Sequence, residues 1–344
     1  MSTQPGFAFA TIGINHGHIY EQTRVMIDAG CWLKSFYAPE DDLAAAYTKA
    51  FPDAKRVTDE RAILEDLEVR LVLGAGILCE RAPMAVRAMR HGKDVMLDKP
   101  GATSLEQLAE LRDVQAETGR ILSILYSEHY TQRATIAAGE LVKAGAIGQV
   151  MQTTGLGPHR EGNYARPDWF YDRDKTGGIL CDIGSHQAEQ FLFFAGANAA
   201  EVVSAQVANF DHPDHPTFED FGQMLIVSDN ATGFVRVDWF TQDGLPVWGD
   251  GRLIVLGTEG TIELRKYIDI AGRPHGDHLF LVDGDGVRHI DCSTTEITYG
   301  RQLRDGVLNR TETAMTQAHC FLATELALKA QAMATRIGGN RPAG

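Results

Sequence analysis

The stretch Asp98-Lys99-Pro100 places a lysine where a cation could take part in chemistry. It follows a short apolar run, residues 95–97, that is typical of a buried strand. Pro100 lacks an N–H and has a fixed φ, so the strand must end and the chain must turn. Lys99 then lies at the carboxyl end of a strand, the edge where open α/β sheets bind ligands. From this stretch alone, a reactive cation and a surface charge before a turn are equally good interpretations.

A second pair of polar residues, Asp182 and His186, follows Gly177-Gly178 and opens a segment that predicts a helix to about Ala195. If the helix begins near Asp182, the two residues share one face, and the carboxylate can orient the imidazole. Histidine, with a pKa of about 6.5, suits the transfer of a hydroxyl proton near neutral pH. Taken singly, a helix cap and an ordinary histidine at a helix start are the favoured interpretations.

A glycine turn stands between a predicted strand, residues 7–12, and a predicted helix, residues 19–29. The dinucleotide fingerprint requires glycine at its first, third and sixth positions, and only Gly13 fits. Any tight turn between strand and helix explains the pattern equally well. His16 and His18 form an H-x-H pair for which the sequence offers no third metal ligand, so we expect them to line a cofactor or substrate entrance and expect no metal. The predicted cofactor contacts of this turn are Gly13, Ile14, Asn15, His16, Gly17 and His18.

The ends of two further strands bear on cofactor choice. The fingerprint expects an acid directly after the second strand, residues 32–37, but Ala38 stands there and the acids come after Pro39, at residues 40–42. No lysine or arginine in this segment could meet a 2′-phosphate, which favours NAD and leaves NADP open. Gly74 and Gly76 follow the strand at 69–73, where small residues let the backbone approach a ligand.

The order of the elements predicts an α/β fold. Strands and helices alternate regularly to about Tyr126, which indicates a doubly wound parallel sheet. From Val202 onward, strand-like segments separated by turns predict a mostly antiparallel sheet. A length of 344 residues suggests two domains, which we place at 1–125 and 126–344.

Composition excludes several classes of protein. The net charge of −14 argues against nucleic acid and anionic membranes as partners. Five scattered cysteines without a C-x-x-C favour reduced thiols in the cytoplasm over a disulfide framework. The first ten residues lack the basic region of a signal peptide, and no apolar stretch approaches the length of a membrane span.

Together, the glycine turn, Asp98-Lys99-Pro100 and Gly177-Gly178-x-x-x-Asp182-x-Gly184-x-His186 resemble the family of glucose–fructose oxidoreductase, inositol 2-dehydrogenase and the MocA protein (Gfo/Idh/MocA), over about residues 7–336. The resemblance implies an NAD(P)-binding Rossmann domain followed by an α/β domain whose open sheet binds substrate and forms a homodimer or homotetramer. It implies an NAD(P)-dependent oxidoreductase acting on a sugar, cyclitol or polyol.

The resemblance also implies that Lys99, Asp182 and His186 are catalytic. Lys99 would stabilise the developing alkoxide, His186 would take the proton, and Asp182 would orient His186 or hold a second hydroxyl. The expected cofactor contacts are those of the glycine turn with Ala38, Gly74, Gly76, Asp98, Lys99 and Pro100; the expected substrate contacts are Lys99, Glu128, His159, Arg160, Trp169, Asp182 and His186.

The sequence departs from the family pattern in four places: Asp98 replaces a glutamate, Ala38 an acid, Gly74-Ala75-Gly76 an Ala-Thr-Pro, and Arg81 a histidine. These departures leave cofactor preference and subgroup open. Two other functions also stay open, a non-catalytic dinucleotide-binding regulator and an NAD-requiring glycosidase. The intact catalytic trio argues against the regulator.

Overall fold

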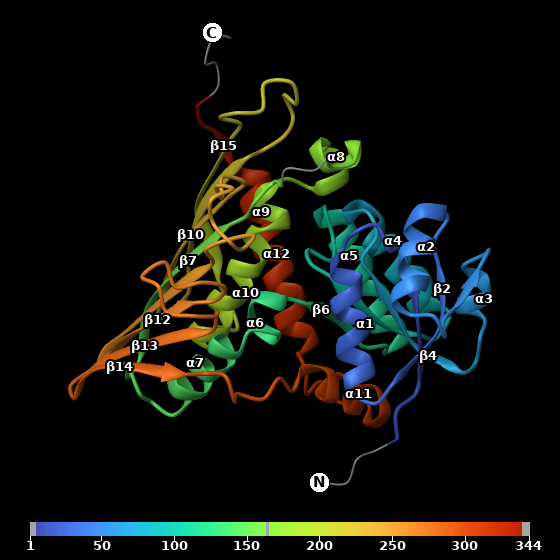
Figure 1. Cartoon of the computed structure of the whole chain (residues 1–344), viewed down its shortest axis with the longest axis horizontal. Helices are drawn as coiled ribbons and strands as arrows, with labels where there is room; N and C mark the ends of the chain where they lie inside the picture. Colours follow the sequence, from blue (N-terminus) through green and yellow to red (C-terminus); the bar gives the residue numbers. More distant parts are fainter. Residues whose placement is uncertain (1–4, 163–164, 339–344) are drawn as a thin grey trace. The chain divides into compact units, whose positions relative to one another are not determined.

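The computed structural model describes residues 5–162 and 165–338, in two compact units (Figure 1). Unit 1 contains the described residues up to Leu125 together with Thr298–Phe321. Unit 2 contains Tyr126–Ile297 and the described residues from Leu322 onward. The sequence analysis assigned all residues after 125 to one domain, so the segment Thr298–Phe321 differs from that expectation.

Long-range contacts explain why Thr298–Phe321 belongs to unit 1. Its helix α11 (Tyr299–Asn309) packs against helix α1 (His18–Asp28). The hydroxyls of Tyr299 and Ser123 share a buried hydrogen bond of 2.7 Å. The Gln317 side chain binds the backbone N–H and C=O of Leu122 at 3.0 and 2.8 Å, as a neighbouring strand would. These partners are more than 170 residues apart in sequence, where no local pattern predicts them.

Unit 1 is built on a six-stranded parallel sheet with the order β3-β2-β1-β4-β5-β6, which confirms the predicted doubly wound sheet. The strand order proceeds in opposite directions from β1 and from β4, so right-handed crossovers place α1 and α4 on opposite faces. Its elements are β1 (Ala8–Ile12), β2 (Trp32–Tyr37), α2 (Asp41–Ala50), β3 (Lys55–Val57), α3 (Arg61–Leu64), β4 (Val69–Gly74), α4 (Leu78–Arg90), β5 (Asp94–Asp98), α5 (Leu105–Thr118) and β6 (Leu122–Leu125).

Helix α4 begins at Leu78 and has Pro83 inside it. A proline cannot donate the helical hydrogen bond, which leaves the carbonyl of Cys79 without that donor. The side-chain amide of Gln107 on α5 donates to this carbonyl at 2.9 Å. Ser104 caps the first turn of α5, since its side chain accepts from the N–H of Gln107.

Unit 2 is built on a nine-stranded sheet with the order β14-β13-β12-β11-β7-β10-β9-β8-β15. Two neighbouring pairs, β7 with β10 and β8 with β15, are parallel and the others antiparallel, so the predicted mostly antiparallel sheet is confirmed. Its strands are β7 (Val150–Pro158), β8 (Glu201–Ala208), β9 (Phe221–Val227), β10 (Thr232–Asp238), β11 (Arg252–Gly257), β12 (Gly260–Arg265), β13 (His278–Asp283), β14 (Gly286–Asp291) and β15 (Thr335–Arg336).

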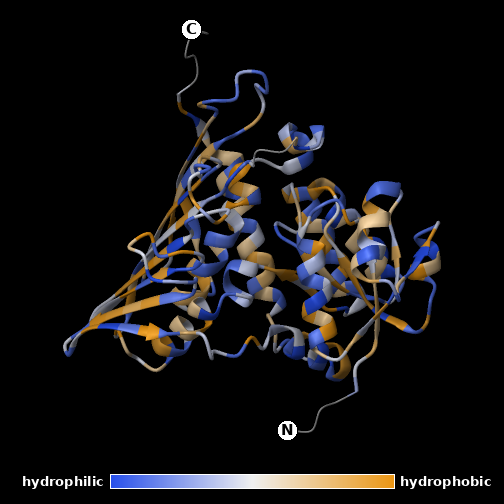
Figure 2. Ribbon diagram, in the orientation of Figure 1, coloured by the Kyte–Doolittle hydropathy of each residue, from blue (hydrophilic) through white to orange (hydrophobic). Residues whose placement is uncertain are grey.

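Helices of unit 2 cover one face of this sheet. Helix α10 packs on β7, β9 and β10, and α7 packs on β12 and β13. Side chains that alternate along the strands, such as Leu253 and Val255, are buried beneath them. Figure 2 shows hydrophobic residues concentrated along the strands of both sheets. The helices are α6 (Ser127–Tyr130), α7 (Arg133–Lys143), the 3₁₀ helix η1 (Asp168–Tyr171), α8 (Arg173–Thr176), α9 (Ile179–Asp182), α10 (Gly184–Ala195) and α12 (Gln317–Met333), whose first residues belong to unit 1.

The opposite face of the sheet carries a row of partly or fully exposed side chains. Register places Ser204, Leu225, Phe234, Thr154, Ile254, Glu263 and Phe280 side by side across seven strands. Among the described residues, no helix is long and apolar enough to span a membrane.

Candidate functional site

In unit 1, two loops meet at the carboxyl ends of β1 and β4, where the strand order reverses. The N–H of Ala75 donates to the carbonyl of Gly13 at 3.0 Å, and the N–H of His16 donates to that of Ala75 at 2.8 Å. Gly13 has a φ of +78°, and a Cβ there would lie 3.0 Å from the Cα of Gly76. Glycine is therefore required for this close approach, which leaves the backbone open to a ligand. Ile14 is buried, and Gly17 is the N-cap residue of α1.

A cavity of about 290 Å³ lies at this meeting point. Two polar atoms of its lining residues are buried and have no hydrogen-bond partner in the described structure, Oε2 of Glu40 and Nη2 of Arg81. One is an acceptor and the other a charged donor, as a ligand with hydroxyl and anionic groups requires. The lining residues are Ile12, Gly13, Asn15, Tyr37, Pro39, Glu40, Glu60, Gly76, Glu80, Arg81, Met84 and Arg87.

Glu40, two residues after Ala38, brings a carboxylate to the cavity. The Ala38 side chain is buried and apolar, and its carbonyl accepts a hydrogen bond from Nη2 of Arg56 at 2.9 Å. Two residues later, Glu40 enters the cavity and its Oε1 accepts from Nδ2 of Asn15 at 2.8 Å. The sequence contained the acid itself, but the direction of its side chain depends on Asn15, 25 residues away, which no local pattern predicts.

Asp98, the last residue of β5, is buried and contacts several ionisable side chains. Its carboxylate lies 2.9 Å from Nδ1 of His18 and 3.0 Å from Nη1 of Arg81. Burial by itself would raise the pKa of Asp98, but His18 and Arg81 lower it well below its usual value. Lys99 and Pro100, which follow directly, are also buried within this unit.

His16, His18 and Asp98 bring their ligand atoms within 4.8 Å of one another, close enough to hold a metal ion. No local pattern predicts this third ligand, because Asp98 is 80 residues from His18. Two contacts oppose a cation: Arg81 already pairs with Asp98, and Nδ1 of His16 accepts from the N–H of His18 at 3.3 Å. Burial, and then His18, lower the pKa of His16 well below its usual value, so His16 is neutral near pH 7. The guanidinium of Arg81 therefore already supplies the positive charge beside Asp98 that a metal ion would otherwise provide.

In unit 2, Glu128 and Lys266 form a buried ion pair, with Nζ of Lys266 2.5 Å from Oε2 of Glu128. Their side chains are 1% and 0% exposed, respectively. Nε2 of Gln187 donates to the same oxygen at 2.8 Å, while Oε1 of Glu128 has no hydrogen-bond partner among the described residues. Burial would raise the pKa of Glu128, but Lys266, and after it His186 and His159, bring it well below its usual range. Glu128 is therefore an ionised acceptor beside His186.

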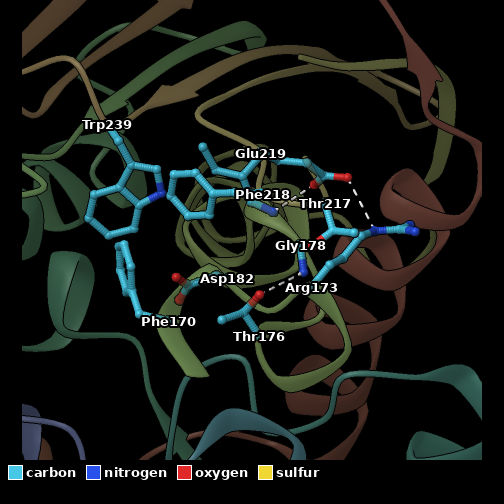
Figure 3. A pocket seen from close by; sticks show the side chains of 10 residues that line it. Phe170, Arg173, Thr176, Gly178, Asp182, Thr217, Phe218, Glu219 and Trp239 are labelled. Atoms are coloured by element: carbon cyan, nitrogen blue, oxygen red, sulfur yellow. Dashed lines mark hydrogen bonds and ion pairs between the residues drawn. The ribbon is translucent and has the colours of Figure 1, made fainter. Parts of the chain in front are cut away.

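Asp182 lines a separate pocket of unit 2, together with Phe170 and Trp239 (Figure 3). The same pocket contains Glu219, whose carboxylate accepts from the N–H of Ile179 at 3.0 Å and from the side chain of Gln331. The open space among these side chains is only about 10 Å³, about the room that one water molecule needs, and the carboxylate of Glu219 is also paired with Arg173 at 3.2 Å. The sequence analysis did not nominate Glu219 or Trp239.

The expected continuous helix from Asp182 to His186 is wrong. Asp182 ends the short helix α9, and His186 lies in the first turn of α10, which begins at Gly184. Helix α9 itself begins at Ile179, directly after Gly178, whose φ of +91° only glycine adopts readily. Asp182 lines the pocket of Figure 3, while His186 is buried beside Glu128 and Tyr126.

Comparisons with known proteins agree with this geometry. The family model described as the GFO/IDH/MocA C-terminal domain matches residues 135–263. A crystal structure from Erwinia carotovora atroseptica, provisionally named an oxidoreductase, is 45% identical, covers 96% of this chain and 100% of its own, and has a TM-score of 0.94. This chain belongs to the Gfo/Idh/MocA family.

Curated relatives within the Gfo/Idh/MocA family act on several compounds. A dTDP-3,4-didehydro-2,6-dideoxy-α-D-glucose 3-reductase from Streptomyces violaceoruber is 31% identical over 61% of this chain and 59% of its own length. The scyllo-inositol 2-dehydrogenase (NAD(+)) of Bacillus subtilis is 26% identical over 59% of this chain and 57% of its own. The chain spans between 34% and 59% of the length of the curated relatives that match it first.

Three residues were expected to contact the substrate: His159, Arg160 and Trp169. The structure places all three within unit 2, where two of them contact other side chains or loops. The ring of His159 lies 4.4 Å from that of Trp248 and 5.4 Å from that of Trp239. Arg160 donates to the carbonyls of Gln242 and Leu245 and so holds that loop. Trp169 lies in η1 but is not among the lining residues of the Figure 3 pocket.

In unit 1, Gly74 ends β4, where a Cβ would meet the side chain of Met84.

His212 connects two loops around the Figure 3 pocket and gives a prediction about pH. Its Nδ1 lies 2.9 Å from Asp220 and its Nε2 lies 2.8 Å from Glu161. The hydrogen bond to Asp220, and after it Glu161, raise the pKa of His212 to about 9 despite partial burial. The folded state then holds a proton that the unfolded state releases near pH 6.5. Its stabilisation is complete below about pH 6.5 and is lost as the pH rises through about 9.

We expect thermal melts to resolve this effect as a difference between the wild type and His212→Gln. The gap in Tm should be largest at pH 6 and should shrink towards pH 10. His215→Gln is a matched control, since His215 stacks on Tyr171 with ring centres 3.8 Å apart. A gap for His212→Gln that stays constant over this range would contradict the assignment.

Proposed function

We propose that this chain is an NAD(P)-dependent oxidoreductase that transfers a hydride between a hydroxyl of a sugar, cyclitol or related polyol and the nicotinamide ring. The observation that carries the proposal is the cavity at the reversal point of the parallel sheet. Its glycine contact between the two loops and its buried, unpartnered Glu40 oxygen fit a dinucleotide. Membership of the Gfo/Idh/MocA family and its relatives named as dehydrogenases and reductases support the same activity.

The residues of the cavity fit the parts of a dinucleotide. The first N–H groups of α1 have no side-chain cap and suit the pyrophosphate. Glu40 suits the ribose hydroxyls, as an acceptor held in place by Asn15. When bound, the nicotinamide supplies the hydride acceptor, which no side chain can provide.

Lys99, His186 and Asp182 are proposed to act on one substrate. Nζ of Lys99 donates to the reacting oxygen and stabilises the alkoxide as it develops. A ring nitrogen of His186 takes the hydroxyl proton, favoured by the negative charge of Glu128 beside it. Asp182 holds another hydroxyl from within the pocket that Phe170 and Trp239 line.

A dehydrogenase screen over inositols, aldoses and sugar acids tests the proposal. Net formation of NADH from a free polyol is the expected result. Turnover of a glycoside without net NADH would instead identify an NAD-requiring glycosidase. Dinucleotide binding without any turnover would identify a regulator. Either result would overturn the proposed reaction.

The cofactor pocket predicts that NAD binds more tightly than NADP. Oε2 of Glu40 is an acceptor for ribose hydroxyls and would repel a 2′-phosphate. We expect Glu40→Gln to weaken NADH binding about tenfold and to narrow the preference over NADPH. Titration of both cofactors by fluorescence measures this, with Glu110→Gln, on the exposed face of α5, as control. Tighter NADPH binding by the wild type would contradict the prediction.

The exposed row of unit 2 supports the proposal of a homodimer or homotetramer through the open sheet face. Leu225 and Ile254 are 43% and 36% exposed on adjoining parts of this row. We expect sedimentation of the wild type at micromolar concentration to give a dimer or larger, and Ile254→Arg to shift it towards monomer. A strictly monomeric wild type would refute the proposal.

A cytoplasmic location likewise stays a prediction from the scattered cysteines.

A further inference from the structure

Arg81 is an almost fully buried arginine whose contacts reach the two features that the proposed reaction needs. Its side chain is 1% exposed on α4, in unit 1. Nη1 donates to the carbonyl of Lys99 and lies 3.0 Å from the carboxylate of Asp98. Nε donates to the carbonyl of Gly76 at 2.9 Å. One guanidinium group therefore joins the loop after β4 to the turn that carries Lys99.

The third nitrogen, Nη2, has no hydrogen-bond partner in the described part of the chain, although it is buried. A buried donor of a charged group is strongly unfavourable when it lacks an acceptor, so we expect a ligand to supply the missing acceptor. Arg81 lines the 290 Å³ cavity between Gly76 and Met84. The cavity thus has a charged donor without a protein acceptor.

The charges around Arg81 favour an anionic acceptor. Arg81 and Lys99 carry two positive charges, Asp98 carries one negative charge, and His16 is neutral because burial lowers its pKa. These three groups leave one positive charge in a buried place, where a charged donor binds a phosphate oxygen more strongly than a neutral hydroxyl. The same cavity is also lined by the carboxylates of Glu40, Glu60 and Glu80 and by Arg87, so the anion is expected at Nη2 of Arg81 and not throughout the cavity.

We infer that Arg81 binds a phosphate oxygen of the dinucleotide through Nη2 and, through Nη1, positions Lys99 for the reaction. The inference rests on the proposed function. It makes Arg81 a positioning residue that links cofactor binding to the catalytic turn. Lysine cannot replace it, because an ammonium group cannot reach the Gly76 carbonyl, the Lys99 carbonyl and a phosphate in one plane.

Binding measurements on Arg81→Lys and Arg81→Ala test the first part. We expect the Kd for NADH to rise about tenfold in Arg81→Lys and further in Arg81→Ala. ADP-ribose, which has both phosphates but no nicotinamide, should lose affinity by the same factor. The control is Arg90→Met, an exposed arginine on the same helix that pairs with Glu110 on the surface. Its affinities should match the wild type.

Turnover and chemical rescue test the second part. We expect kcat of Arg81→Ala to fall about a hundredfold at saturating NAD, and guanidinium ion in the tens of millimolar range to restore part of it. Guanidinium should not raise the activity of the wild type or of Arg90→Met. A role in folding alone would lower Tm without changing the Kd or kcat of the folded fraction, and rescue would fail.

If Arg81→Ala does not fold, Arg81→Lys tests the inference on its own. An NADH affinity and a kcat of Arg81→Lys within twofold of the wild type would overturn the inference and leave the proposed function intact. A wild type that binds no dinucleotide would refute the proposed function itself.

Discussion

Replacing Lys99 or His186 by alanine is expected to lower turnover about a hundredfold or more, the usual scale for losing an electrostatic or acid–base group. NADH binding should survive in both variants, because the cofactor contacts that we propose lie in residues 13–18, Glu40, Arg81 and the end of β4. The measurement is kcat on the polyol found by the screen, with an NADH titration on the same samples.

Two exposed residues provide controls for these variants. Lys34 pairs with Asp66 and Glu68 at the surface, and His91 lies at the exposed end of α4. Lys34→Ala and His91→Ala should keep wild-type turnover. A Lys99→Ala variant with normal kcat would contradict the proposed mechanism, as would a dinucleotide-bound structure in which His186 lies far from Lys99.

The sequence predicted what local patterns encode. Buried strands and capped helices made the parallel sheet predictable, and Pro100 placed Lys99 at its carboxyl edge. The sequence did not predict that Glu40 stands in for an acid at Ala38, because that depends on how the chain turns after Pro39. Nor did it predict β13, whose first two residues are both buried and break the alternation, or β14, whose residues are nearly all exposed.

Residues that act through distant partners were the ones missed. Arg81 was noted only as a departure from the family pattern, since its partners lie 5 and 18 residues away. Lys266 was not nominated because its partner Glu128 is 138 residues distant. Polar residues buried by long-range pairing have no signature in spacing or periodicity, so only the fold identifies them.

Replacing Lys266 by methionine is expected to destabilise the protein by about 3–5 kcal/mol, because it leaves the buried charge of Glu128 without its partner. Lys329→Met is a matched control: Lys329 also lies 2.5 Å from a glutamate oxygen, of Glu325, but it is 54% exposed. That change should cost less than about 1 kcal/mol. Urea unfolding of the two variants measures the difference that burial makes.

The loss of folding stability in Lys266→Met should grow with pH, and this pH dependence identifies the cause of the loss. Without Lys266, burial becomes the main influence on Glu128 and raises its pKa in the folded state above the usual value of about 4.5. The folded variant then binds a proton that the unfolded chain releases, so it loses stability as the pH rises above about 4.5. We expect a smaller loss at pH 5 than at pH 8, and Glu128→Gln in the same chain should remove the dependence. A loss that is equal at both pH values would mean that packing around the Lys266 side chain, rather than the stranded carboxylate, sets the stability.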